Sequence, residues 1–175
     1  PAQRLQVQSD KPIATVTLRL IAGQIAVDGF SPAYEAAPVA VVDVFSVPGA
    51  TAQGWRGAEG EALRQGDDRG PPYDVVLFQY GTNEAMDDSF DGEAYARELR
   101  SALSRFRVLN ARSRCIVVGP PDRGTPRNAG RGDPQRLAHV HRAIATIQQK
   151  VAVEKACGFF NWQAAMGGPG AAFRW

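Results

Sequence analysis

Short, uninterrupted runs of apolar residues alternate along most of this chain with stretches of helical periodicity, and this alternation constrains the fold more than any other feature. The runs cover Val39–Phe45, Val75–Tyr80, Cys115–Val118 and Gly158–Phe160. Strands that are apolar on both sides must be buried on both faces, which is typical of parallel sheets between helical layers. We therefore predict an α/β domain with a parallel sheet over residues 38–175.

Two of the segments between these runs carry apolar residues at spacings of three and four, which places them on one side of an α-helix. The first follows Asp91, a candidate N-cap, and the second follows Asp133, with Pro134 at the first helical position. Both helices should pack on the sheet. A shorter helix is predicted within Thr51–Gln65. The two apolar stripes comprise Ala96, Leu99, Leu103 and Phe106, then Leu137, Val140, Ile144, Ile147 and Val151.

Residues 1–37 follow a different pattern, and we predict that they form a separate β-rich segment. Apolar and polar residues alternate from Ile13 to Ile21, as in a half-buried strand. Gly23 interrupts the pattern, and Gln24–Val27 is predicted to form a second short strand. The two strands would form an antiparallel hairpin or the end of an all-β module.

Composition and charge exclude several classes of protein. With 44% hydrophobic and 22% charged residues, the chain has the composition of an ordinary globular protein. Its 20 Lys and Arg against 18 Asp and Glu give a net charge of only +2. The densest basic stretch, Arg123–Arg136, contains Gly, Pro and Asp but no aromatic residue, so no nucleic-acid binding is expected. The apolar runs are far shorter than the roughly 18 residues of a membrane span, and none is predicted.

Candidate site residues lie just after the apolar runs, because ligands of parallel α/β sheets bind at the carboxyl ends of the strands. Gly49 follows the first run and Asn83 follows the second. A glycine N–H in a tight turn and an asparagine amide on a neighbouring turn can form an oxyanion hole for acyl transfer. Taken singly, each residue is better explained as a turn former.

Taken together, these segments resemble blocks of the SGNH (GDSL-type) hydrolases. Val-Pro-Gly-Ala-Thr-Ala around Gly49 and Leu-Phe-Gln-Tyr-Gly-Thr-Asn-Glu-Ala around Asn83 resemble the second and third blocks of that superfamily. Asn161–Gly170 looks like a segment of its bacterial peptidoglycan O-acetylesterase branch. The resemblance begins near Val39 and runs to the end of the chain. It implies a three-layer α/β/α sandwich with a flavodoxin-like parallel sheet, and it assigns Gly49 and Asn83 as two oxyanion donors.

The chain also departs from the family pattern. Family members carry the nucleophilic serine in a Gly-Asp-Ser block and the other triad members in an Asp-x-x-His block, and neither block occurs in these 175 residues. The simplest interpretation is a longer protein truncated at both ends, with Gln6–Phe30 as the last strands of an inserted β-sandwich module. The family's serine strand lies between the strands that correspond to Val39–Phe45 and Val75–Tyr80. A gap there would leave unpaired backbone groups at about 1–3 kcal/mol each, so we expect that strand in the natural protein.

The resemblance implies a serine carbohydrate esterase that removes O-acetyl groups from peptidoglycan, a related glycan or a small ester. A serine would attack the acetyl carbonyl, assisted by a histidine that an aspartate orients. The resemblance implies no metal or organic cofactor. It does imply a periplasmic or secreted location. The 175 residues alone are expected to be inactive. The alternative is a non-catalytic glycan-binding or assembly protein that keeps the scaffold without the triad.

The remaining polar candidates are interpreted as structural. His139 and His141 lie two residues apart on a helix, project from nearly opposite sides, and are expected on its surface. Ser89 has no base in reach and is expected to be a loop serine. Three acidic residues are expected to place favourable charge at the start of the following helix rather than to bind a metal; they are Asp87, Asp88 and Asp91.

Two further assignments stay open. Cys115 and Cys157 each open a predicted strand, so neighbouring strands would allow a disulfide, whereas other arrangements leave two buried thiols. A disulfide would support an oxidising compartment. Gln163 and the Gly167–Gly170 turn either line the rim of the site or have a structural role.

Overall fold

The computed structural model describes residues 6–25, 40, 42, 44, 46, 48–56, 73–123 and 136–174. The chain divides into two units, residues 1–44 and 45–175. This division lies a few residues after the one predicted at residues 37 and 38. None of the helices that the structure describes is long and apolar enough to cross a membrane.

Residues 6–25 of the first unit carry no helix or strand. The strand predicted over Ile13–Ile21 is therefore wrong. Its apolar side chains are exposed, among them Val16 at 56% and Leu18 at 64%. An alternating pattern becomes a strand only beside a hydrogen-bonded neighbour, and an isolated hairpin is marginal in water. The strand predicted over Gln24–Val27 extends beyond the described residues, and residues 24 and 25 are not in a strand either.

The apolar run Val39–Phe45 is also not a strand at the positions that the structure describes, which are 40, 42 and 44. Val42 is 82% exposed and Val44 is 78% exposed, so the prediction of a buried strand is wrong there. The physical reason is the lack of a partner: among the described residues, no strand lies beyond β1 to receive this run as the next neighbour.

The second unit contains the predicted parallel sheet. Its strands are β1 (Val75–Gln79), β2 (Arg114–Val118) and β3 (Gly158–Phe160), in the order β1-β2-β3. The register pairs Val75 with Arg114 and Ile116 with Gly158. Three of the four apolar runs are thus confirmed as parallel strands. All their carboxyl ends meet at one edge of the sheet, where Gly81, Gly119 and Asn161 follow the strands.

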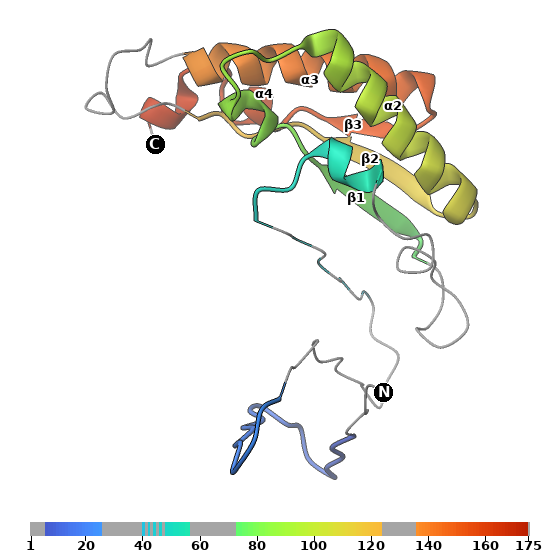
Figure 1. Cartoon of the computed structure of the whole chain (residues 1–175), viewed down its shortest axis with the longest axis vertical. Helices are drawn as coiled ribbons and strands as arrows, with labels where there is room; N and C mark the ends of the chain where they lie inside the picture. Colours follow the sequence, from blue (N-terminus) through green and yellow to red (C-terminus); the bar gives the residue numbers. More distant parts are fainter. Residues whose placement is uncertain are drawn as a thin grey trace. The chain divides into compact units, whose positions relative to one another are not determined.

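Two long helices, α2 (Gly92–Leu109) and α3 (Arg136–Glu154), lie side by side against one face of the sheet (Figure 1). The Asp91 carboxylate accepts hydrogen bonds from the backbone N–H groups of Glu93 and Ala94, which confirms the predicted N-cap. The predicted cap at Asp133 lies outside the described residues. The described residues of this unit also form the short helices η1 (Ala52–Arg56), η2 (Glu84–Met86), α4 (Trp162–Ala165) and η3 (Ala171–Phe173).

The core lies between the sheet and these two helices. Phe78 and Val117 point into it, and Phe78 packs edge-on against Phe106 of α2. The residues next to them along the strands point to the other face, where Val75 is 47% exposed and Leu77 is 63% exposed. The α/β fold with a parallel sheet is confirmed, and the described residues supply the sheet and a helical layer on one of its faces.

A disulfide links Cys115 and Cys157, whose Cα atoms are 4.9 Å apart. This settles the alternative that the sequence left open. The register places Ile116 beside Gly158, so the two residues that precede them lie side by side on neighbouring strands. The bond closes the β2-α3-β3 crossover into a covalent loop.

Candidate active site

Gly49 lies in an exposed turn that leads into η1. Its φ angle is +78°, in the left-handed region that L side chains avoid. A Cβ atom built on this residue would meet no atom of the other described residues within 4 Å. The preference for glycine therefore comes from the backbone conformation, which a tight turn requires, and not from crowding.

Asn83 lies in the loop after β1, with its side chain exposed. Its Nδ2 atom donates a hydrogen bond of 2.7 Å to the carbonyl oxygen of Ala50. A primary amide carries two N–H groups, so this bond orients the amide and leaves the second N–H available to a ligand. The Asn83 amide thus lies beside the residue that follows Gly49.

The carboxylate of Glu84 connects the same two loops. One oxygen, Oε1, accepts the backbone N–H of Ala52 at 2.9 Å, and the other, Oε2, accepts the N–H of Gly81 at 2.9 Å. Ala52 is the first residue of η1, whereas Gly81 is the second residue of the loop after β1. A single side chain therefore joins the turn that carries Gly49 to the turn that carries Asn83.

Helix α3 packs against the loop after β1 and supports it. Gly81 has a φ of +112°, and a Cβ atom on it would lie 2.7 Å from Cγ2 of Ile144. The buried Gln148 donates from Nε2 to the carbonyl oxygen of Tyr80 and to the hydroxyl of Tyr95, each at 2.8 Å. Burial, followed by the nearby Glu84 carboxylate, raises the pKa of Tyr95, which keeps its hydroxyl neutral.

His141 is completely buried, so its predicted place on the helix surface is wrong. His139 is exposed, as predicted. His141 follows Leu137 by four residues and precedes Ile144 by three, which places it on the buried stripe of α3. Its ring lies near the backbones of Thr82 and Pro121. Burial lowers the pKa of His141, and this outweighs the opposing effects of Pro121 and of the Asp122 carboxylate.

Ser89 and the acidic residues around it form a local turn. The Ser89 hydroxyl donates to Oδ1 of Asp87 at 2.7 Å, and its backbone N–H donates to the same oxygen at 2.8 Å. These bonds lower the pKa of Asp87. Asp88 forms an exposed ion pair with Arg136. In the described residues no group of three or more His, Cys, Asp or Glu side chains could hold a metal ion.

Gln163 has a structural role. It is buried and donates from Nε2 to Oδ1 of Asp122 at 2.8 Å and to the carbonyl oxygen of Ala138 at 2.7 Å. The other carboxylate oxygen of Asp122 accepts the backbone N–H of Ala172 at 2.8 Å. Gln163 and Asp122 therefore fasten the C-terminal segment to the end of β2.

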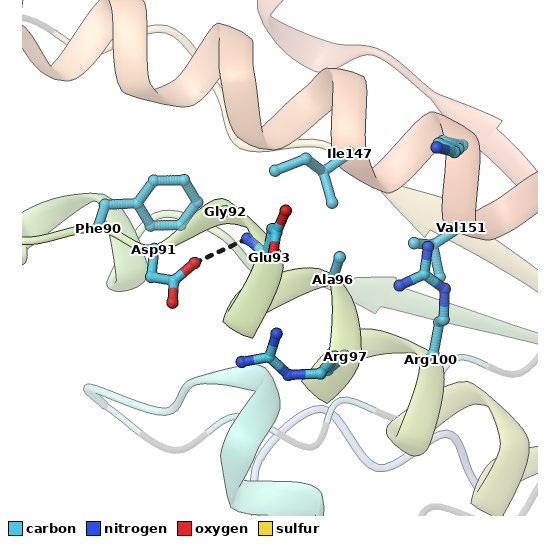
Figure 2. A pocket seen from close by; sticks show the side chains of 10 residues that line it. Phe90, Asp91, Gly92, Glu93, Ala96, Arg97, Arg100, Ile147 and Val151 are labelled. Carbon is cyan, nitrogen blue, oxygen red and sulfur yellow. Dashed lines mark hydrogen bonds between the residues drawn. The ribbon is translucent and has the colours of Figure 1, made fainter.

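A groove of about 690 Å³ lies elsewhere, between α2 and α3. Figure 2 shows Asp91 capping α2 at one end, with Arg97 and Arg100 farther along the same helix and Ile147 opposite them on α3. Neither Gly49 nor Asn83 lines this groove. It is therefore a hollow between two helices that includes the end of the loop after β1, at Phe90 and Asp91, but neither candidate donor.

Glu84 and Gln148 support these loops, and the sequence motifs did not single them out. His141 is considered from the sequence, but as a surface residue. The helical spacing of α3 could have identified Gln148 and His141, because both fall on its buried stripe. No comparable signal marks Glu84, whose partner Ala52 is 32 residues away.

Comparisons with known proteins agree with this architecture. The chain is similar to a solved structure described as "Peptidoglycan O-acetylesterase in action, 5 min", with 24% identity and a TM-score of 0.57. The match covers 73% of this chain and 35% of the other, so this chain spans about a third of that protein's length. A comparison with curated proteins finds no significant match. A model of the GDSL-like lipase/acylhydrolase family matches residues 22–175. Because this match covers most of the sequence, the chain belongs to the GDSL-like lipase/acylhydrolase family.

Proposed function

We propose that this chain is the core of an SGNH-type serine esterase that removes O-acetyl groups from peptidoglycan or a related glycan. Membership of an acylhydrolase family supports the reaction, and the likeness to a peptidoglycan O-acetylesterase supports the substrate. The disulfide between Cys115 and Cys157 supports a periplasmic or secreted location, because such bonds persist in oxidising compartments.

In this proposal Gly49 and Asn83 are the oxyanion donors. The observation that carries the assignment is the 2.7 Å bond from the Asn83 amide to Ala50, the residue next to Gly49. This bond holds the Asn83 amide beside the residue that follows Gly49 and leaves its second N–H available, which supports the assignment of both residues as donors. The two bonds that the Glu84 carboxylate accepts from Ala52 and Gly81, called the Glu84 clamp below, hold both loops in the same arrangement.

The proposed reaction is acyl transfer in two steps. A serine hydroxyl adds to the acetyl carbonyl while a histidine takes its proton, and the carbonyl oxygen becomes an anion that the Asn83 amide and the Gly49 N–H stabilise. The C–O bond to the sugar then breaks, and the sugar oxygen receives the proton. Water hydrolyses the acetyl-serine to acetate. The serine, histidine and aspartate would be supplied by parts of a longer chain, because neither family block that carries them occurs here.

The test is p-nitrophenyl acetate hydrolysis by the complete gene product. Asn83→Ala should lower kcat by about 10²- to 10³-fold, the usual effect of removing one oxyanion donor. Ser89→Ala is the control and should leave kcat unchanged, because its hydroxyl donates to Asp87 and to no other described residue. The 175-residue chain alone should show no hydrolysis above a denatured sample.

Two results would contradict the proposal. A kcat of Asn83→Ala equal to that of the wild type would show that Asn83 is not an oxyanion donor. A complete gene product that binds acetylated glycan without hydrolysing it would instead support the non-catalytic alternative.

A further inference from the structure

We propose that Glu84 is the positioning residue of this oxyanion hole, because its carboxylate sets the distance between the loop of Gly49 and the loop of Asn83. This inference rests on the proposed function. Glu84 would not touch the substrate. It would act through the two backbone N–H groups that it accepts, those of Ala52 and Gly81.

The two bonds use different oxygens of one carboxylate, and each reaches a different loop. An ionised carboxylate only accepts hydrogen bonds, so both oxygens can take a backbone N–H at the same time. Bonds to a charged acceptor are also stronger than those between neutral groups. A glutamine at position 84 has the same size but only one carbonyl oxygen, so it could keep at most one of these bonds.

The backbone of Glu84 is itself well fixed. It is the first residue of η2, where Asp87 donates its N–H to the carbonyl oxygen of Glu84 and Met86 donates to that of Asn83. Ala85, the next residue, is completely buried. Asn83 and Glu84 therefore project from one short, anchored turn, and both side chains reach residues 50–52.

The two ends of the clamp differ in how they are supported. Gly81 packs against Ile144, and the preceding Tyr80 carbonyl accepts a bond from Gln148, so α3 holds this end in place. Gly49 instead lies in an exposed turn, and a Cβ atom added there would contact none of the residues that the structure describes. Breaking the clamp should therefore displace the turn of Gly49 relative to Asn83, while the loop after β1 stays in place.

The kinetic test compares Glu84→Gln with wild type in the complete gene product, using p-nitrophenyl acetate. Because displacing a catalytic group by about 1 Å can cost about 10²-fold, kcat should fall by about 10- to 100-fold. KM should change by less than about threefold, because an oxyanion donor acts on the transition state rather than on the bound ester. The matched control is Glu93→Gln, an exposed glutamate on α2, which should leave both constants unchanged.

A second measurement detects the hydrogen bonds of Glu84 without measuring enzymatic activity. In the complete gene product, Glu84→Gln should shift the amide NMR signals of Ala52 and Gly81, because both lose a charged acceptor. Unchanged signals for these two amides would overturn the inference directly. This readout also applies if a more drastic variant such as Glu84→Ala fails to fold.

The outcomes separate this inference from the proposed function. Loss of kcat in Asn83→Ala with wild-type kcat in Glu84→Gln would overturn the role of Glu84 alone. Wild-type kcat in both variants would overturn both. A Glu84→Gln protein with raised KM and a lowered melting temperature would assign Glu84 a general structural role and would overturn the inference as well.

Discussion

The imidazole of His141 is enclosed beneath the loops that follow β1 and β2, and this burial has a consequence for pH dependence. The groups around it are the backbones of Thr82 and Pro121, the Asp122 carboxylate and the cationic Arg123. Neither ring nitrogen forms a hydrogen bond within the described residues. The folded protein therefore favours the neutral ring, and burial lowers its pKa.

Stability should consequently fall as the pH drops through the ordinary histidine range. In the unfolded chain His141 binds a proton near its ordinary pKa of about 6.5, whereas the folded state binds it only at lower pH. Burial of His141 therefore does not reduce the free energy of unfolding above about pH 6.5, and it reduces that free energy progressively below this pH. Urea unfolding of the wild type at about pH 7.5 and about pH 5.5 should show this loss, and His141→Leu should lack it. His139→Leu is the exposed control, and equal losses in all three proteins would contradict this explanation.

Single residues also show which parts of the candidate site could be predicted from the sequence. Gly49 and Asn83 could be proposed as oxyanion donors because each lies within a short motif after an apolar run. Glu84 and Gln148 could not be identified in that way, since their partners Ala52 and Tyr80 lie 32 and 68 residues away. A hydrogen bond of that separation depends on the folded arrangement, which a motif does not encode.

At the scale of elements, the predictions that succeeded describe segments that carry their own structural signals. Helix α2 has its cap at Asp91 and its apolar stripe within the same 18 residues. Strands β1 to β3 also pair with one another within the second unit. The segments Ile13–Ile21 and Val39–Phe45 have equally good patterns, but a strand exists only with a partner. The pattern predicts which side of a strand would be buried, but it does not show whether a second strand is present to form hydrogen bonds with it.

Asp122 joins elements that are distant in the sequence, and its removal should loosen them together. Its carboxylate accepts from Gln163 of α4 and from the N–H of Ala172 in η3. Asp122→Ala would leave the Ala172 N–H without a partner and Gln163 with only the Ala138 carbonyl. Because a donor left without its partner costs about 1–3 kcal/mol, unfolding should become easier by at least about 1–3 kcal/mol. Chemical denaturation measures this, and Asp88→Ala, at an exposed carboxylate, should cost less than about 0.5 kcal/mol. Equal effects for the two variants would contradict the role of Asp122.

At the scale of the whole second unit, the sheet presents one apolar face that the described residues do not cover. Leu77 of β1 is 63% exposed and Phe160 of β3 is 49% exposed. Parallel sheets are normally covered by helices on both faces. An apolar surface of this kind drives binding or self-association when nothing covers it. The 175-residue chain should therefore bind a hydrophobic dye such as ANS and should self-associate as its concentration rises.

The double variant Leu77→Lys with Phe160→Lys tests whether this face is responsible. Sedimentation velocity should show less association and ANS fluorescence should fall, because two charges interrupt the apolar surface. Both side chains are about half exposed or more, so the melting temperature should change little. Val108→Lys, at an 83% exposed position on α2, is the matched control and should leave association unchanged. If the double variant associates as strongly as the wild type, self-association arises elsewhere, and the uncovered face of the sheet is not its cause.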